Sequence, residues 1–346
     1  IGPSLSGMAA LMALFTPWFY GILIAMFFVG VADAIWTIGR EIAGIDLVRI
    51  AQRGRLLSGF FGVYTTGQTI GPLIGGVLTV VFSFHAIFVA FVAMSFVALV
   101  LGLNSHDSRP PSTPNINKAG SFNWRGFFSI RRQIAGLAEV ISQIDHSLRA
   151  TYAVLVFATF TNTVFRIALQ SMLPLYAGGK LGLSPAEVGL LFSISGALVF
   201  VMIIPSGFVI DKIGRKWASV PSTGFPAIAF ALIPFADTFA QLVPLVSLTG
   251  VAIGLSLGSL ATSTYDIAPP AARGRVQATR RTIANFGGIG APLVGGVLAN
   301  AFDPGIPFLA YAPLLLAGAV LLALFGRETL AREVGHATGK RDRERP

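Results

Sequence analysis

A few polar side chains stand within long apolar stretches of this sequence, and they are the residues best placed to do chemistry. An ionisable group at hydrocarbon depth is costly, so it is a functional candidate by default. Asp33 lies in such a stretch. Loss of hydration raises the pKa of a carboxylate toward neutrality, which would let Asp33 take up and release a proton. The alternative is that Asp33 is a partner for a residue on further helices expected before residue 1.

A second group of polar residues lies in a later apolar stretch. Asn162, Arg166 and Gln170 are spaced by four, which places them on one face of a helix. Such a stripe predicts a surface that binds a polar ligand or forms a gate, although Arg166 could instead buttress the outer ends of the helices. Ser259 stands with Ser256 and Ser263 on roughly one helical face, and its hydroxyl could contact a ligand or bond to its own backbone.

Several kinds of chemistry are excluded by composition and spacing. The chain has no cysteine and only four scattered histidines, so we expect no disulfide, no thiolate chemistry and no metal site. The apolar stretches hold no Ser/His/Asp or Cys/His constellation, which argues against an enzyme. A glycine-rich loop of the G-x-x-x-x-G-K-[ST] type is absent, so ATP is not the direct energy source.

Composition places the chain in a lipid bilayer. Of its 346 residues 54% are hydrophobic and only 12% are charged, whereas a soluble domain carries about a quarter charged residues. A helix needs about 20 apolar residues to cross the hydrocarbon core. We expect ten such helices, the first of them short, at residues 1–16, 18–43, 56–81, 85–103, 151–176, 186–210, 217–236, 240–265, 275–300 and 306–326.

The basic residues predict which loops face the cytoplasm. Once the spans are drawn, Lys and Arg gather in alternate loops, in residues 104–150 and in the tail, while Lys180 stands alone on the other side. Cytoplasmic loops carry such an excess. The net charge of +10 therefore reflects orientation in a plasma (inner) membrane and not nucleic-acid binding. We expect the lipid bilayer and a small-molecule substrate as partners, and a monomer.

The sequence contains an internal repeat. Residues 29–88 align without a gap with residues 249–308. Both copies run in the same topological direction, which is the relation expected of a parallel repeat. On this relation the first half would begin about 70 residues before residue 1, so we expect two further helices there. The shared residues include Asp46/Asp266, Arg53/Arg273, Gly54/Gly274, Arg55/Arg275, Gly67/Gly287, Pro72/Pro292, Gly75/Gly295 and Gly76/Gly296.

One loop carries a family resemblance. Residues 207–216, with the sequence GFVIDKIGRK, resemble the G-x-x-x-D-[RK]-x-G-R-[RK] loop signature of the major facilitator superfamily of membrane transporters. The resemblance covers nearly the whole chain and implies an all-α membrane protein with two pseudo-symmetric helical bundles, ten of whose twelve helices are present. It divides the chain into a first bundle (1–103), a linker with an amphipathic helix (104–150), a six-helix bundle (151–326) and a tail (327–346).

The resemblance gives the charged residues near this loop a role. Asp46 with Arg53, and Asp266 with Arg273, share the spacing D-x6-R at the cytoplasmic end of a helix. We expect Asp266, Arg273 and the signature residues Asp211 and Arg215 to form a latch that closes in one conformation and opens in another. Asp46 and Arg53 would do the same in the first half. The alternative is a set of solvated interfacial charges, which contribute little.

A glycine motif resembles the antiporter signature G-x-x-x-G-P-x-x-G-G of the same family. It comprises Gly67, Gly71, Pro72, Gly75 and Gly76. Small residues four apart let helices approach closely, and proline removes one backbone hydrogen bond. The motif favours a tightly packed hinge that suppresses leak in an exporter, although packing alone would also explain it.

Together these features predict a secondary active transporter that works by alternating access. The resemblance implies proton-coupled efflux of a small amphipathic molecule, with the proton gradient as energy source and no cofactor. A symporter or facilitator for a sugar or an organic anion is the alternative within the same class, and Arg166 favours it. A membrane scaffold or receptor without transport activity is the alternative of another class, but it has no need of Asn162, Arg166 and Gln170 at hydrocarbon depth.

Overall fold

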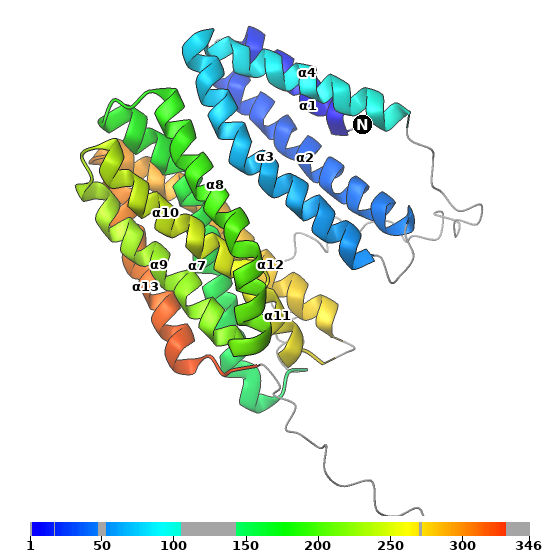
Figure 1. The fold of residues 1–346 in the computed structure, drawn as a ribbon, viewed down its shortest axis with the longest axis vertical. Helices are drawn as coiled ribbons and strands as arrows, with labels where there is room; N and C mark the ends of the chain where they lie inside the picture. Colours follow the sequence, from blue (N-terminus) through cyan, green and yellow to red (C-terminus); the bar gives the residue numbers. More distant parts are fainter. Residues whose placement is uncertain (1, 17, 48–52, 105–142, 270–271, 330–346) are drawn as a thin grey trace, which may run out of the picture. The chain divides into compact units, whose positions relative to one another are not determined.

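The computed structural model describes residues 2–16, 18–47, 53–104, 143–269 and 272–329. Within these ranges the chain forms helices and turns and no strand (Figure 1). Only helices can cross hydrocarbon as single segments, because each satisfies its own backbone hydrogen bonds. The predicted amphipathic helix of the linker lies outside the described residues.

The chain divides into two compact units. The first contains residues 1–128 and 177–200, and the second contains residues 129–176 and 201–346. These units are defined by the contacts between their residues. The bundle boundaries predicted from the sequence have a different basis and stay a prediction.

The described residues of the first unit form four helices and most of a fifth. In it α1 contacts both α2 and α4, and α3 also contacts α4. The helix α1 has 14 residues, as short as the sequence predicts. The helices are α1 (Gly2–Phe15), α2 (Phe19–Leu47), α3 (Arg53–Val81), α4 (Phe84–Leu103) and the first part of α8 (Pro185–Phe208).

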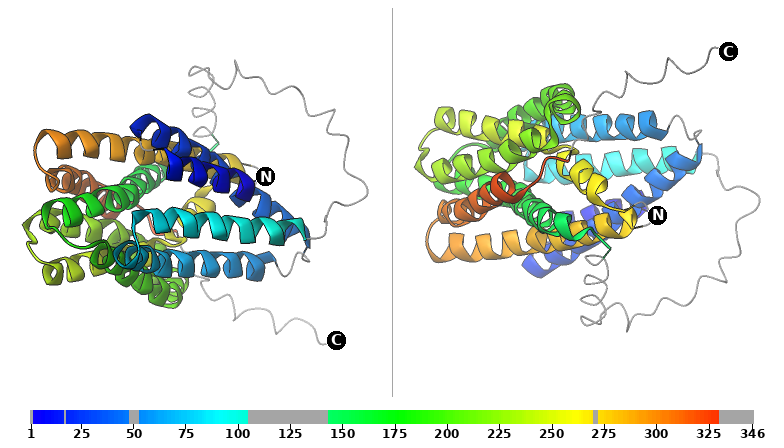
Figure 2. Two further views of the ribbon diagram at one scale, coloured as in Figure 1. Left: turned by 90° about the horizontal axis from the view of Figure 1, so that it is seen from above. Right: turned by 90° about the horizontal axis from the view of Figure 1, so that it is seen from below.

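The second unit contains most of the second half of the sequence. In it α7 contacts both α12 and α13, while α9 contacts α10 and α13 (Figures 1 and 2). The elements are η3 (His146–Leu148), α7 (Arg149–Pro174), η5 (Val209–Ile213), α9 (Arg215–Leu232), η6 (Ile233–Phe235), α10 (Phe239–Ser256), α11 (Ser259–Ile267), α12 (Arg273–Ala301) and α13 (Ile306–Phe325). The π-helical η4 (Leu175–Lys180) links the two units between α7 and α8.

The span expected at 240–265 is not one continuous helix. Helix α10 ends at Ser256, Leu257 has an extended backbone, and Gly258 has φ 87° before α11 begins. A residue with a side chain rarely adopts this left-handed conformation, so glycine permits the break. Ser256 and Ser259 therefore lie on separate helices, and the predicted stripe of three serines is interrupted.

Small residues let the helices of the second unit pack closely. A Cβ added to Gly287 of α12 would lie 2.8 Å from Val164 Cγ2 of α7, and one added to Gly318 of α13 would lie 2.6 Å from Thr161 Oγ1. Helices that have no hydrophobic drive to associate in lipid rely on such close contact.

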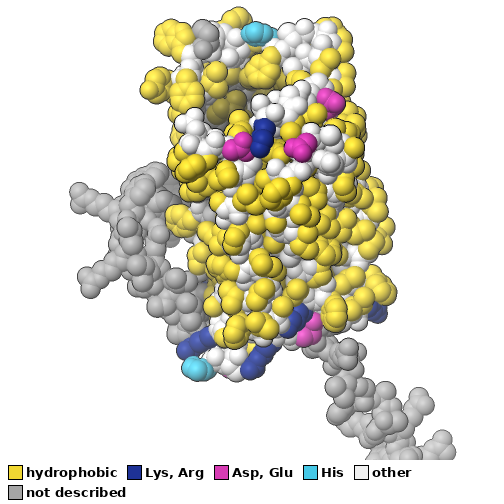
Figure 3. Space-filling model, turned by 90° about the vertical axis from the view of Figure 1, so that its left-hand side faces the viewer, with side chains coloured by type: hydrophobic (Ala, Val, Ile, Leu, Met, Phe, Trp, Pro, Cys, Tyr) yellow, Lys and Arg dark blue, Asp and Glu magenta, His cyan; other side chains and the backbone are white. Residues whose placement is uncertain are grey.

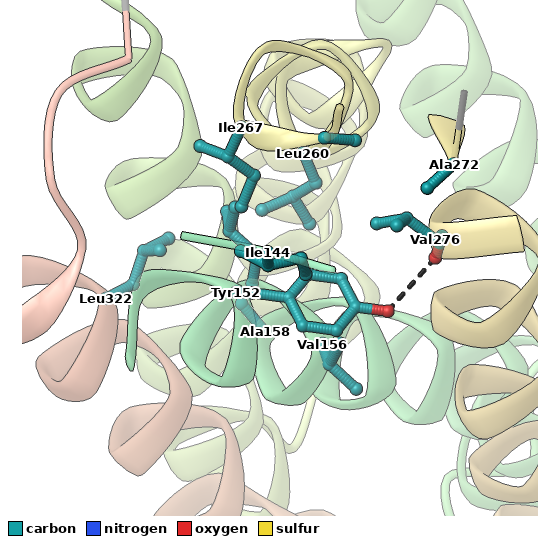
Figure 4. Packing of buried hydrophobic residues seen from close by; sticks show 11 residues of the cluster. Ile144, Tyr152, Val156, Ala158, Leu260, Ile267, Ala272, Val276 and Leu322 are labelled. Carbon is teal, nitrogen blue, oxygen red and sulfur yellow. Dashed lines mark hydrogen bonds between the residues drawn. The ribbon is translucent and has the colours of Figure 1, made fainter. Parts of the chain in front are cut away.

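A buried cluster holds the ends of α7, α11, α12 and α13 together (Figure 4). At its centre Tyr152 is 2% exposed, and its hydroxyl donates a hydrogen bond to the backbone oxygen of Val276 at 3.0 Å. The cluster surrounds the ring with aliphatic side chains, namely Ile144, Leu155, Val156, Ala158, Leu260, Ile267, Ala268, Ala272, Val276 and Leu322.

The surface of the described helices suits a bilayer. Among the described residues eight helical stretches are long and apolar enough to cross a membrane. They match all the predicted spans except the short first one and the span of α3, both of which are helical in the structure. Figure 3 shows yellow apolar side chains across the middle of one face and most of the dark blue Lys and Arg side chains at one end.

We expect Tyr152→Phe to lower the free energy of unfolding by about 1 kcal/mol, because it deletes one buried hydrogen bond without opening a cavity. Thermal unfolding of the purified protein in detergent, followed by tryptophan fluorescence, measures the effect. Tyr20→Phe is the control because Tyr20 is exposed. Equal unfolding temperatures for the two variants would show that the bond to Val276 does not stabilise the cluster.

Candidate functional site

The loop signature takes part in an ion pair. Arg215, the first residue of α9, places Nη1 2.8 Å from Oδ2 of Asp266 near the end of α11. The two side chains are 17% and 25% exposed, so water screens the pair only partly. A loop residue and an acid of the repeated D-x6-R pattern therefore meet in the second unit.

A carboxylate that the sequence analysis missed completes this cluster. Glu328, three residues after α13, accepts hydrogen bonds from the backbone N–H groups of Arg215 at 2.9 Å and Lys216 at 3.1 Å. It caps α9, where free N–H groups and the helix dipole favour a negative charge. Gly214 has φ 150°, a conformation that residues with a side chain rarely adopt, which explains the glycine of the signature. An acid shortly after a last apolar helix was the only sequence signal for this contact.

The remaining members of the predicted latch have other surroundings. The Arg273 guanidinium lies over the ring of Tyr265, with Cζ 4.1 Å from the ring centroid, and Nη1 donates to the Tyr265 hydroxyl at 3.1 Å. Asp211 is exposed in η5. The side chains of Asp46 and Arg53 lie outside the described part of the chain. The structure thus brings Arg215 to Asp266, and the role of these residues as a latch stays a prediction.

The glycine motif of α3 packs against α8 within the first unit. A Cβ added to Gly76 would lie 2.5 Å from the backbone oxygen of Pro185, and one added to Gly189 would lie 2.2 Å from the backbone oxygen of Pro72. At Gly196 an added Cβ would lie 2.8 Å from Thr69 Cα. Glycines on both helices therefore permit a backbone-to-backbone approach that side chains would prevent.

The other glycines of the motif do not share this contact. A Cβ at Gly67, Gly71 or Gly75 would meet no atom within 4 Å apart from those of its own helix. The motif thus contains one glycine, Gly76, whose lack of a side chain the packing requires.

The predicted polar residues are distributed over both units. Asp33 is exposed within the apolar part of α2 in the first unit. In the second unit Asn162 is 9% exposed and its Nδ2 has no hydrogen-bond partner among the described residues. Arg166 is half-buried and Gln170 is exposed. Ser259 is fully buried, and its Oγ likewise has no partner within the described ranges.

The burial of Arg280 was not predicted from the sequence. Arg280 is 4% exposed on α12, two turns after Arg273. Its Nη1 donates to Thr159 Oγ1 at 2.8 Å, and its Nε and Nη2 donate to Gln277 Oε1 at 3.2 and 2.9 Å. The spacing of three between Gln277 and Arg280 was only a weak sequence signal for this site. The burial of Arg280 depends on the contact of α12 with α7, which the sequence does not reveal.

The sequence matches the family model described as Major Facilitator Superfamily over residues 1–147 and 155–344. The chain belongs to the major facilitator superfamily. It is thus a multi-pass membrane protein of a family of secondary transporters. No curated protein matches the chain significantly.

Solved structures of other superfamily members share its fold. A peptide transporter POT in complex with sulfate has a TM-score of 0.69 at 15% identity, with 93% of this chain and 78% of that chain covered. A mutant of peptide transporter POT in complex with sulfate has a TM-score of 0.74 at 14% identity, with coverages of 95% and 80%. A POT family transporter in complex with 5-aminolevulinic acid has a TM-score of 0.71 at 11% identity, with coverages of 94% and 80%.

A double-mutant cycle tests the ion pair between Arg215 and Asp266. We expect Arg215→Gln and Asp266→Asn to be coupled by about 1 kcal/mol in the free energy of unfolding, because the pair is only partly screened. Thermal unfolding of the four proteins measures the coupling. The cycle of Lys216→Gln with Asp266→Asn is the control. Additive effects in the first cycle would mean that the pair contributes nothing to stability.

Alanine substitutions test the approach of α3 to α8. We expect Gly189→Ala to lower the free energy of unfolding by about 1–3 kcal/mol, because its methyl group would overlap the backbone at Pro72. Gly71→Ala on α3 is the matched control and should be neutral or stabilising by up to about 1 kcal/mol, since alanine is the better helix former. Thermal unfolding checks both variants, and a neutral Gly189→Ala would contradict the close approach.

Proposed function

We propose that this protein exports a small amphipathic solute across the plasma membrane in exchange for protons, by alternating access. Its membership of the major facilitator superfamily supports secondary transport. The observation that carries the exporter proposal is the backbone contact of the α3 glycine motif with α8 at Pro72 and Gly76. The proposal also assigns the basic loops and the tail to the cytoplasm.

The contact between α3 and α8 suits an exporter for a physical reason. Where two helices meet through glycines, no side chain stands between their backbones, so the seam excludes water and ions. Pro72 lacks a backbone N–H group, so one helical hydrogen bond of α3 is absent where α3 meets α8. This lets α3 bend at Pro72 while the two helices stay in contact. A tight seam would keep protons from leaking while the transporter changes conformation.

Asp33 is the proposed proton carrier. It is exposed in the apolar part of α2, and a charged side chain is costly at hydrocarbon depth. Protonation removes that cost, so the charge on Asp33 can differ between the two access states. The proton gradient would then be the energy source, and no resident cofactor is needed.

The ion pair of Arg215 with Asp266 supports the proposed latch. Both residues lie at helix ends, and the Glu328 cap fixes the backbone of Arg215. A bond between helix ends that forms in one state and breaks in the other biases the equilibrium between them.

A second candidate function is uptake of an organic anion or sugar by symport or facilitated diffusion. Arg166 at hydrocarbon depth favours it, because a cation there suits an anionic solute. The similar structures add to it, since two of them are of a peptide transporter and one holds 5-aminolevulinic acid. Their sequence identity to this chain is low, so the similarity shows the fold and only suggests the class of solute.

Flux measurements with Asp33→Asn test the proposal. The protein is reconstituted into proteoliposomes that are loaded with ethidium, a cationic amphipathic probe, or with carboxyfluorescein, an anionic one. An imposed pH gradient should accelerate the movement of at least one probe across the membrane. We expect Asp33→Asn to reduce this acceleration at least tenfold, because an amide cannot carry the proton. The exposed Asp237→Asn is the matched control. If the pH gradient does not change the flux through the unmodified protein, proton exchange is excluded.

A further inference from the structure

Arg280 is a buried cation whose hydrogen-bond partners in the described part of the chain are neutral. It donates three hydrogen bonds, one to the hydroxyl of Thr159 and two to the amide oxygen of Gln277. Among the described residues it forms no ion pair with a carboxylate. A buried charge that lacks an opposite charge is strongly unfavourable, so the site calls for an anion.

The neighbours of Arg280 are held in place by further bonds. Thr159 donates its own hydroxyl hydrogen to the backbone oxygen of Leu155 at 2.7 Å, so its lone pair is turned to Arg280. Gln277 donates through Nε2 to the backbone oxygen of Ala261 at 2.6 Å, which turns its oxygen to Arg280. Both partners are therefore fixed as acceptors, and neither brings negative charge.

The guanidinium retains unused donors. Of its five N–H groups three are used within the described residues, which leaves one on Nη1 and one on Nη2. Two N–H groups at the end of a guanidinium match the two oxygens of a carboxylate. Arg280 is thus immobilised on one side and still able to bind a carboxylate on the other.

The same region holds further donors without partners. Helix α11 begins after Gly258, and the first backbone bond of its first turn is from Thr262 N to the oxygen of Gly258, so the N–H groups of Ser259, Leu260 and Ala261 precede the helical ladder. The buried Oγ of Ser259 and the buried Nδ2 of Asn162 also have no partner in the described part of the chain.

These groups belong to helices that contact one another in the second unit. Arg280 of α12 bonds to Thr159 of α7, one turn before Asn162, and Gln277 of α12 bonds to Ala261 in the first turn of α11. The unpartnered side-chain groups of this region are an amide nitrogen and a hydroxyl, both of which can donate, and Arg280 carries a full positive charge. The start of a half-helix adds the positive end of its dipole.

We propose that Arg280, Asn162 and the first turn of α11 bind the carboxylate of the transported solute. This rests on the proposed function and names its substrate class, an amphipathic carboxylate. Removal of Arg280 would then abolish binding of the anion without loss of an internal ion pair.

Binding measurements test this site directly. The purified protein is titrated with 4-phenylbutyrate and with the uncharged 4-phenylbutyramide at pH 7, and unfolding is followed by tryptophan fluorescence. We expect the carboxylate to raise the unfolding temperature and the amide to have at least tenfold lower affinity. Benzoate and acetate extend the series to shorter anions. If no carboxylate of the series protects the protein, the proposal is wrong.

Variants distinguish a solute site from an internal ion pair. We expect Arg280→Gln to unfold at an equal or higher temperature without ligand, because it removes a buried charge, and to lose protection by 4-phenylbutyrate. Arg281→Gln, at an exposed position on the same helix, should retain it, and Arg280→Lys should retain it in part. A large destabilisation by Arg280→Gln with unchanged protection in the remaining folded protein would instead assign Arg280 to a carboxylate of this chain.

Flux separates the failure of this site from the failure of the proposed function. Proton-driven movement of ethidium in a protein that no carboxylate protects would overturn the anion site and leave the export proposal standing. Protection by 4-phenylbutyrate in a protein whose flux ignores the pH gradient would support the site and overturn proton exchange.

Discussion

Every backbone N–H and C=O group within hydrocarbon must find its partner inside the protein, and the rest of this structure depends on that requirement. It makes each span a helix and leaves side chains to decide how the helices associate. Since lipid is as apolar as leucine, close contact between small residues replaces the hydrophobic effect as the force between helices. Gly76 and Gly189 in the first unit and Gly287 and Gly318 in the second are positions where the packing leaves no room for a Cβ.

Backbone N–H groups without a partner in their own helix occur where the regular helices are interrupted. The break at Leu257 and Gly258 frees the N–H groups that begin α11 and places Ser259 in a buried first turn. The turn at Gly214 frees those that begin α9, and Glu328 accepts two of them. One helix start thus has a carboxylate of the chain, while the other lies in a region with Arg280 and no carboxylate among the described residues. That contrast underlies the inference of an anionic solute.

Arg215 and Arg280, both in the second unit, illustrate how the surroundings of an arginine set its function. Arg215 is partly exposed and has a carboxylate partner, so its bond can break at modest cost when helix ends separate. Arg280 is buried among neutral acceptors, so an opposite charge that enters is bound strongly. A cation of the first kind suits a latch, and one of the second kind suits a ligand site.

The sequence by itself determined the all-helical membrane fold, because composition and span length alone decide how a chain meets lipid, and the loop signature of residues 207–216 indicated the family. It also predicted that Arg215 and Asp266 belong to one cluster. It did not predict Glu328 as a cap, the burial of Arg280 or the break at Gly258. Each of these depends on contacts between residues far apart in the chain, or on a backbone angle that glycine permits without requiring. Only the tertiary structure decided these three features. Sequence periodicity describes each helix separately, whereas the surroundings of a charged side chain are set by the packing of several helices.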